Sequence, residues 1–282
     1  MQSIAKNLKR EGKSLGLVPT MGFLHEGHIS LVRGSKAAND VTIVSIFVNP
    51  AQFAPNEDFN RYPRDLERDK KILENENVDY IFAPEAADIY PPGFSTYITV
   101  EELSNVIEGE IRPIHFKGVT TIVNILFNAT LADNAYFGQK DAQQATILAK
   151  MAADQCAPIK VHIEPIVRET DGLALSSRNI YLSSEERSEA VLISQSLKIA
   201  KEFIEIGKYD CAVIIKAMQK HLSGAKTGLP DYIKIVNAKT FHSIDKIEQG
   251  GEYFILVAFK FGKTRLIDNL YIDYREEIPV MQ

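Results

Sequence analysis

Residues 41–48, Val-Thr-Ile-Val-Ser-Ile-Phe-Val, form the segment that most limits how this chain can fold. β-Branched and apolar side chains follow one another here with little polar alternation, so a strand over these residues would bury both of its faces. Strands buried on both faces belong to the centre of a parallel sheet, because crossover helices cover each side. The segment therefore predicts an α/β fold.

The first 170 residues alternate between strand-like and helix-like runs. Further strands are expected over 15–18, 78–82, 135–138 and 159–166. Helices are expected over 4–11, from 27 or 28 to 38, and over 64–75, 119–127 and 141–156. Strands that alternate with helices predict a Rossmann-like, doubly wound parallel sheet with helices on both faces. In such folds ligands bind beyond the carboxyl ends of the strands.

The pattern changes after residue 169. Ser183, followed three residues later by Glu186, is typical of a capping box that starts a helix ending near residue 206. The run Glu185–Arg187 is interpreted as a solvated first turn. A helix over 210–222 and strands over 232–236, 253–259 and 265–272 follow. We therefore expect two domains, a Rossmann-like domain over 1–169 and a smaller α+β domain over 170–282.

Composition and charge restrict the class of protein. The 282 residues include 45% hydrophobic and 24% charged side chains, as in an ordinary soluble protein, and the formal net charge of −5 argues against broad nucleic-acid binding. The N-terminus has no apolar signal-peptide core, and no apolar run approaches the roughly 18 to 20 residues that span a bilayer. We expect a cytoplasmic protein with no nucleic-acid or membrane partner. Cys156 and Cys211 are expected to be free, buried thiols, although a disulfide stays open.

The segment Pro19–His28, PTMGFLHEGH, joins the first expected strand to a helix. His25 and His28 are three residues apart, so their rings lie on the same side of the first helical turn. Unpaired N–H groups and the positive end of the helix dipole favour phosphate there, and Gly27 lets a ligand ring approach the backbone. The segment predicts a triphosphate site in which imidazole N–H groups face the α-phosphate.

Other interpretations of the histidine pair stay open at this level. One or both rings could cap the helix or pack against it, since the motif is short. A zinc site is disfavoured, because HEGH lacks the i, i+4 spacing of HExxH and no third ligand is nearby. The residues alone do not choose between capping and phosphate binding.

Two polar turns are further candidates. Phe137–Asp141 is a second strand-to-helix turn, in which Lys140 could meet a phosphate and Asp141 could act through Mg²⁺ or cap the helix. Ser176–Asn179 offers two hydroxyl groups and a guanidinium that suit phosphate oxygens. Each turn also fits a solvated surface segment without a ligand.

Together these motifs carry a family resemblance that covers nearly the whole chain. The HxGH-like element after a strand is similar to the nucleotide-binding signature of the superfamily that includes class I aminoacyl-tRNA synthetases. The longer string PTMGFLHEGH resembles the pantothenate synthetase (pantoate–β-alanine ligase) family specifically. Further matches follow in the family's order: SIFVNPAQF (45–53), YPR (62–64), IYPPG (89–93), RPIHFKGV (112–119), FGQKDAQQ (137–144), DGLALSSRN (171–179) and RLIDN (265–269).

The resemblance implies a set of ATP contacts. They are Met21, Gly22, Phe23, Leu24, His25, Glu26, Gly27, His28, Gly138, Gln139, Lys140, Asp141, Val167, Leu175, Ser176, Ser177 and Arg178. Within this set, 175–178 would close over ATP as a mobile loop, and Val167 would contact adenine through its backbone. The family more often has glutamate where Gln139 stands.

The resemblance also implies a site for the other substrates. Gln52 and Gln144, which alone would pass as surface glutamines, would hold pantoate, with Asn49 beside them. Arg112 and His115 would border the cavity for pantoate and β-alanine.

The reaction implied by the resemblance is ATP-dependent condensation of pantoate with β-alanine to pantothenate through a pantoyl adenylate, with release of AMP and pyrophosphate. His25, His28, Lys140 and Arg178 would be the catalytic residues, with His28 as the proton donor or strongest transition-state partner. Mg²⁺ would neutralise the phosphates. The domain over 170–282 would close over the active site, and the family implies a homodimer formed through the large domain.

Two rival functions stay open. A nucleotidyltransferase of the same superfamily shares the HxGH element, and a nucleotide sensor without catalysis would need only the phosphate-facing residues. Family members also commonly begin with a short strand before the first helix, whereas this chain starts at that helix.

Overall fold

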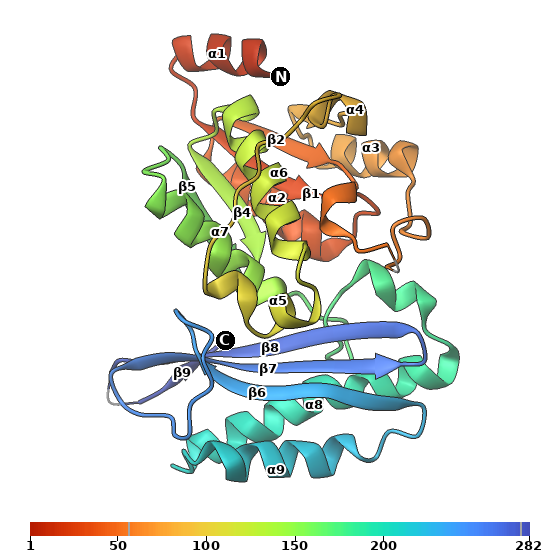
Figure 1. The fold of residues 1–282 in the computed structure, drawn as a ribbon, viewed down its shortest axis with the longest axis vertical. Coiled ribbons are helices and arrows are strands. Elements are labelled where there is room, and N and C mark those ends of the chain that lie inside the picture. The colour runs from red at the N-terminus through yellow and green to blue at the C-terminus, as the bar shows by residue number, and fades with distance from the viewer. Residues whose placement is uncertain (56, 277) are drawn as a thin grey trace. The chain divides into compact units, whose positions relative to one another are not determined.

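The computed structural model describes residues 1–55, 57–276 and 278–282. Their backbone divides into two compact units (Figure 1). The first unit holds residues 1–139 and 143–164, and the second holds residues 140–142 and 165–282. The short segment Lys140–Ala142 therefore belongs to the second unit, although its neighbours in sequence belong to the first.

A parallel sheet with the strand order β3-β2-β1-β4-β5 forms the centre of the first unit. Its strands are β1 (Leu15–Thr20), β2 (Val41–Ile46), β3 (Tyr80–Phe82), β4 (Asn134–Gly138) and β5 (Lys160–Glu164). The pairings are parallel, and β1 aligns with β2 from Leu15 opposite Val41 to Thr20 opposite Ile46. This sheet confirms the predicted α/β class.

Helices cover both faces of this sheet. The helices of this part of the chain are α1 (Gln2–Arg10), α2 (Glu26–Ala38), α3 (Leu66–Asn75), α4 (Ala86–Ile89), α5 (Glu108–Ile111), α6 (His115–Thr130) and α7 (Ala142–Asp154), with 3-10 turns η1 (Pro50–Gln52) and η2 (Leu103–Asn105). The 3-10 turn η3 (Gln139–Asp141) leads from β4 into α7. On one face Val18 of β1 packs with Val32 of α2 and Leu73 of α3. Leu17 points to the opposite face, where α6 lies close to β1.

The strand order reverses direction at β1. The chain runs from β1 outward to β2 and β3, and it then returns to place β4 on the other side of β1. The carboxyl ends of β1 and β4 are therefore neighbours. Such a switch point is where open α/β sheets bind their ligands. Residues 19–28 and 137–141, which the sequence predicts as strand-to-helix turns, leave β1 and β4 at this switch point.

The second unit contains an antiparallel sheet with the order β6-β7-β8-β9. Its elements are η4 (Ser177–Tyr181), α8 (Ser184–Glu205), α9 (Cys211–Leu222), β6 (Gly228–Asn237), β7 (Gly251–Phe261), β8 (Thr264–Tyr274) and β9 (Val280–Met281). The two helices pack on one face of the sheet, where Leu197 and Ile214 meet Ile255 in a shared core (Figure 1). The Ser183 Oγ accepts from the Glu186 N–H and Glu186 accepts from the Ser183 N–H, which confirms the predicted capping box.

Several element boundaries differ from the sequence-based prediction by a few residues, and two of them lie in segments of the candidate site. Strand β1 was expected to end before Pro19, but it continues to Thr20. Proline lacks an N–H, yet the carbonyls around it can still accept, and the Phe47 N–H donates to Thr20 O at 3.0 Å. Helix α6 starts at His115, before the predicted 119, and Gly118 lies inside it where the helix approaches Ala51 closely.

The first turn of α8 is not simply solvated. Arg187 donates from Nη1 to Asp171 (2.7 Å) and from Nη2 to Glu169 (2.9 Å). The Arg187 hydrogen bond lowers the pKa of the Asp171 carboxyl below its ordinary value. The interpretation of this turn as a solvated run was therefore wrong, since the arginine joins α8 to the segment before η4.

The two cysteines are free, as expected, but only one of them is buried. Cys211 is buried at the start of α9, and burial raises the pKa of its thiol to about 12. Cys156 is exposed, because it lies in the turn that leaves α7 with a φ of +50°. No helix among the described residues is long and apolar enough to cross a membrane.

Candidate active site

A carboxylate from α3 holds the loop that follows β1. Asp69, which is only 1% exposed, accepts from the N–H groups of Phe23 (2.7 Å) and Leu24 (2.8 Å). Gly22 has a φ of +79°, and a Cβ there would lie 3.0 Å from the Asp69 carboxylate. Glycine suits this conformation, so Gly22 and Asp69 together set the path of the chain into α2.

The two histidines lie at the N-terminus of α2. His25 is the N-cap residue, and its ring centroid is 4.0 Å from that of His28. The His25 backbone N–H donates to His28 Nδ1 at 3.3 Å. A ring nitrogen that accepts a hydrogen bond carries no proton, so Nε2 of His28 is the nitrogen that can donate. Capping and ligand binding are thus compatible, since each uses a different nitrogen of one ring.

A relay of side chains orients Gln52 beyond the end of β2. The Tyr90 hydroxyl donates to Asn49 Oδ1 at 2.7 Å. Asn49 Nδ2 in turn donates to Gln52 Oε1 at 3.2 Å and to Gly118 O at 3.0 Å. Burial raises the pKa of Tyr90 to about 12, so the hydroxyl stays a donor at neutral pH. Its oxygen is used inside the protein and one Nε2 hydrogen donates to Met21 Sδ at 2.9 Å, so the second Nε2 hydrogen is the group that Gln52 can offer to a ligand.

The first turn of α6 supports the same loop. His115, which is 9% exposed, places Nδ1 3.0 Å from Gln52 O. A Cβ on Gly118 would lie 2.4 Å from Ala51 O, so glycine is needed where α6 approaches η1. His115 thus holds the backbone of Gln52.

Arg112 contacts a carboxylate of the same unit. Its Nε and Nη2 atoms donate to the two oxygens of Glu57 at 2.5 and 2.9 Å. Burial disfavours the ionised Glu57 carboxyl, but the Arg112 hydrogen bond and charge outweigh burial and lower its pKa. The bidentate geometry fixes the guanidinium beside the loop that follows η1.

The end of β4 leaves space for a ligand. A Cβ on Gly138 would meet no atom within 4 Å, so no protein neighbour requires glycine there. Gln139 is buried, and Gln143 is used internally, since its Oε1 accepts from the Glu108 N–H at 3.1 Å. Gln144 is half-buried, and no hydrogen bond to its side chain is seen among the residues that the structure describes. Of these two neighbouring glutamines, Gln144 is the one that can serve a ligand.

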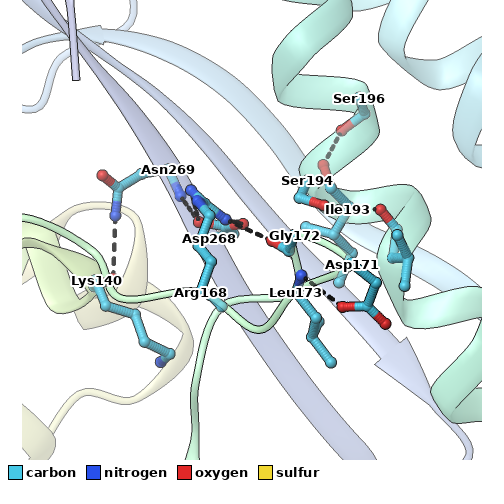
Figure 2. A network of polar contacts seen from close by, with 12 residues as sticks. Lys140, Arg168, Asp171, Gly172, Leu173, Ile193, Ser194, Ser196, Asp268 and Asn269 are labelled. Carbon is cyan, nitrogen blue, oxygen red and sulfur yellow. Dashed lines mark hydrogen bonds and ion pairs between the residues drawn. The ribbon is translucent and has the colours of Figure 1, made fainter. Parts of the chain in front are cut away.

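Lys140 and Asp141 belong to the second unit. The Lys140 side chain is 21% exposed, and its Nζ lies 4.0 Å from Asp141 Oδ1. The Lys140 carbonyl accepts from Asn269 Nδ2 at 3.0 Å (Figure 2). The lysine backbone is therefore fixed by β8 while its ammonium group stays accessible.

Asp141, in the turn after β4, is the carboxylate of the candidate site that could bind Mg²⁺. The Asp141 side chain is 51% exposed. Over residues 1–55, 57–276 and 278–282, no group of three or more His, Cys, Asp or Glu side chains could hold a metal ion. A single carboxylate fits Mg²⁺ that is bound mainly through substrate phosphates and water, as this ion usually is.

The candidate phosphate loop follows a short hairpin in the second unit. The Leu175 N–H donates to Val167 O at 3.0 Å, and Arg168 bridges to Ala174. Ser176 then caps η4, because its Oγ accepts from the Arg178 N–H at 3.2 Å. The hairpin thus determines where the polar turn begins.

The remaining ATP candidates differ in burial and in their contacts. Ser177 is buried, whereas Arg178 is half-buried. Glu26 is exposed and forms an ion pair with Arg33 of its own helix. Leu24 is buried in the core, so it shapes the loop through packing.

Within the first unit, the structure brings many predicted residues to one edge of the sheet. The segments after β1, β2 and β4 contain Met21, Gly22, Phe23, His25, Gly27, His28, Asn49, Gln52 and Gln139. The predicted residues of the second unit lie either at Lys140–Asp141, held by β8, or on the hairpin and η4.

Sequence reasoning missed the residues that hold these groups in place. They are Glu57, Asp69, Tyr90, Asp268 and Asn269. IYPPG and RLIDN were recognised as family matches but received no role. Asp69 is one of several charged residues in α3, and the other charged residues of this helix are not buried, so no local pattern distinguishes it.

Comparison with known proteins identifies the family of this chain. The family model for pantoate-beta-alanine ligase matches residues 1–271. The chain belongs to the pantoate–β-alanine ligase family. It is accordingly an enzyme of the ligase class, and the resemblance stated from the motifs is confirmed.

Relatives and solved structures of this family cover nearly the full chain. Pantothenate synthetase from Caldicellulosiruptor bescii is 52% identical over 97% of this chain and 96% of its own length. That from Acetivibrio thermocellus is 50% identical with the same coverage. The crystal structure of pantothenate synthetase from Thermus thermophilus aligns with a TM-score of 0.88 at 41% identity, covering 94% of this chain and 96% of that chain.

A solved structure of this family with bound ligands also aligns with the chain. Pantoate-beta-alanine ligase from Francisella tularensis, complexed with Beta-gamma ATP and Beta-alanine, aligns with a TM-score of 0.77 at 36% identity. The alignment covers 95% of this chain and 93% of that chain.

Proposed function

We propose that the chain condenses pantoate with β-alanine to pantothenate in an ATP-dependent reaction through a pantoyl adenylate. One observation carries the proposal: in a chain of this family, the segments after the adjacent strands β1, β2 and β4 meet at the switch point of the sheet. They bring imidazole N–H groups and amide N–H groups to the edge where a nucleotide and a hydroxy acid would bind.

In the first step, a carboxylate oxygen of pantoate attacks the α-phosphorus of ATP. The new bond joins carboxylate oxygen to phosphorus, and the bond to the departing pyrophosphate breaks. Pantoate is already ionised at neutral pH, so this step needs no general base. The protein's role is to position the reactants and to stabilise the charge that develops on phosphate.

We assign charge stabilisation to His28, His25, Lys140 and Arg178. The assignment is supported for His28 by the hydrogen bond at Nδ1, which leaves Nε2–H as a neutral donor toward a phosphate oxygen. We therefore favour His28 as a transition-state partner that donates a hydrogen bond and keeps its proton. The hydroxyls of Ser176 and Ser177 would complete the phosphate contacts.

We assign the pantoate site to Gln52 and Gln144, with Asn49, His115 and Arg112 in support. The relay from Tyr90 supports Gln52 as a donor to the pantoate oxygens.

In the second step, the amine of β-alanine attacks the acyl carbon of the adenylate after losing a proton. The carbon–oxygen bond to phosphate breaks, AMP leaves and the amide forms. The mixed anhydride is itself activated, so no serine or cysteine nucleophile is needed.

Mg²⁺ would neutralise phosphate charge when bound, with Asp141 as its protein ligand. The remaining assignments extend the same proposal: residues 1–169 bind ATP and pantoate, residues 170–282 close over the active site, and the enzyme works in the cytoplasm as a homodimer.

Isotope exchange tests the proposed reaction. With ATP, Mg²⁺ and pantoate but no β-alanine, the enzyme should exchange labelled pyrophosphate into ATP, and β-alanine should then yield amide and AMP. Pantoate labelled with ¹⁸O in its carboxylate should transfer one ¹⁸O to AMP. Exchange that needs another acceptor would indicate a nucleotidyltransferase, and nucleotide binding without exchange would indicate a sensor. Label in inorganic phosphate would exclude the adenylate.

A further inference from the structure

Two adjacent residues of β8 hold both ATP-facing segments of the second unit. Asp268 and Asn269 are 4% and 2% exposed, and each is hydrogen-bonded to a different segment (Figure 2). Neighbouring residues on a strand point to opposite faces of the sheet, so the two side chains act on different sides of β8. Neither residue received a role from the sequence beyond its place in the RLIDN match.

Asp268 holds the hairpin that leads to the candidate phosphate loop. Arg168 donates to its two carboxylate oxygens at 2.6 and 3.0 Å in a bidentate pair. The same guanidinium donates from Nη1 to Gly172 O at 3.1 Å, across the turn of the hairpin. Gly172 has a φ of +96°, which glycine tolerates and other residues resist. The carboxylate therefore fixes both the strand and the turn of the hairpin that ends at Leu175.

Asn269 holds Lys140. Its Nδ2 donates to the Lys140 carbonyl at 3.0 Å. We call Asp268 and Asn269 the two anchors, since each holds one segment. The Asn269 backbone N–H donates to Asp268 Oδ1 at 2.8 Å, so the anchors are also joined to each other. Figure 2 shows Asn269 in contact with Lys140, and Asp268 in contact with Arg168, whose guanidinium also meets Gly172.

We propose that Asp268 and Asn269 are positioning residues that set the spacing between the Lys140 ammonium and the Ser176–Arg178 turn. This inference rests on the proposed function, in which both groups contact the phosphates of ATP. Two phosphate-binding groups on separate segments are useful only at a fixed separation, because a displacement of about 1 Å can cost about 10²-fold in rate. A single strand that holds both provides that separation.

Two variants test the anchors separately. Asn269→Leu keeps the approximate size of the side chain but cannot donate to Lys140 O. Asp268→Asn keeps the shape but loses the charge that binds Arg168. The matched controls are Asn237→Leu, which removes turn-capping bonds at the end of β6, and Asp231→Asn, which weakens an ion pair with Arg265 on β8 itself.

Steady-state kinetics provide the first readout. Both anchor variants should raise the KM for ATP in pyrophosphate exchange about tenfold and lower kcat, while the KM for pantoate stays within about twofold. The two controls should keep the wild-type KM for ATP. If both changes act on one spacing, the double anchor variant should lose less than the product of the single losses. An unchanged KM for ATP in both anchor variants would overturn the proposal.

Amide hydrogen exchange without nucleotide provides a readout that does not depend on activity. Asn269→Leu should speed exchange in the peptide over 139–144, and Asp268→Asn should speed it over 168–179. Unchanged exchange in these peptides would overturn the anchoring. A wild-type enzyme without pyrophosphate exchange would instead refute the proposed function, so the two failures are distinguishable.

Discussion

His28 accepts a hydrogen bond at Nδ1 from the backbone N–H of His25, the N-cap residue of its own helix. This contact decides which ring nitrogen of His28 can donate to a ligand. The same logic applies to Gln52, whose oxygen accepts from Asn49 and whose amide nitrogen donates one hydrogen to Met21 Sδ and keeps a second as a donor. At both positions the chemical character of an ambivalent side chain is fixed by a neighbour. A sequence motif identifies the residue, but the group hydrogen-bonded to its side chain determines which atom of that side chain can donate or accept.

Replacing His28 by alanine should lower kcat for pyrophosphate exchange by about 10²-fold or more, the scale of losing one charge-stabilising donor. The matched control is His221→Ala, since His221 lies on α9 and contacts Gln195 at the surface. It should retain wild-type kcat. Near-normal turnover of the His28 variant would contradict its role.

Tyr90→Phe should weaken pantoate binding without removing any group that touches pantoate. Loss of the hydroxyl leaves Asn49 Oδ1 without its Tyr90 donor. Asn49 keeps its contacts with the Ala51 N–H and Gly118 O, but it is oriented less firmly toward Gln52. We expect the KM for pantoate to rise about 3- to 10-fold, equivalent to about 1 kcal/mol for one lost hydrogen bond, with the KM for ATP nearly constant. Tyr97→Phe, at an exposed position, is the control. Equal effects on both substrates would contradict the relay.

At the scale of elements, helices supply the groups that shape the loops at the sheet edge. Helix α3 provides Asp69 for the loop after β1, and α6 provides His115 for the loop after β2. Each contact joins segments that lie tens of residues apart in sequence. The loops therefore depend on the packing of their neighbours, and a change in a helix should be felt in substrate binding.

Asp69→Asn should destabilise the first unit and weaken ATP binding together. An amide oxygen can replace only one of the two carboxylate acceptors, so one buried N–H of Phe23 or Leu24 loses its partner. The expected loss in the free energy of unfolding is about 2 to 3 kcal/mol, measured by urea denaturation. Asp65→Asn at the N-cap of the same helix should be nearly neutral, because either residue caps well.

The pair of Glu57 and Arg112 should make stability depend on pH. The pKa of Glu57 is lower in the folded chain than its ordinary value of 4.5, so the unfolded chain binds more protons as pH falls. Its contribution is therefore complete above about pH 4.5 and is lost as pH falls through the folded pKa. Wild type and Glu57→Gln should differ in unfolding free energy by a constant amount from pH 6 to 8 and should converge in acid.

The control for this titration is Glu67→Gln, since the Glu67 side chain is 77% exposed. It should show no such convergence. Parallel curves for wild type and Glu57→Gln down to pH 3 would show that the pair is not coupled to folding.

At the scale of the whole molecule, the edge strand β5 bears on assembly. Among the described strands, β5 pairs with β4 alone, and Ile163 on it is 44% exposed. An open edge with an apolar side chain favours contact with another chain. Light scattering of the purified enzyme should give twice the mass of one chain, and Ile163→Glu should shift the equilibrium toward monomer. A monomer at micromolar wild-type enzyme would contradict the predicted homodimer.

The sequence by itself determined the class of fold and the main motifs, because both are written in local patterns. The apolar run over 41–48 predicted a strand buried on both faces, and the capping box of Ser183 and Glu186 predicted the start of α8. Boundaries were less certain where a single residue misled, as Pro19 did at the end of β1.

Only the tertiary structure decided which residues support the site. Asp69, Tyr90, Asp268 and Asn269 act across long separations in sequence, and their partners are mostly backbone groups or ambivalent amides. A hydrogen bond to a distant carbonyl leaves no periodicity and no spacing in the sequence. Local patterns specify elements, whereas the donors and acceptors that remain at their ends are paired only once the elements have packed.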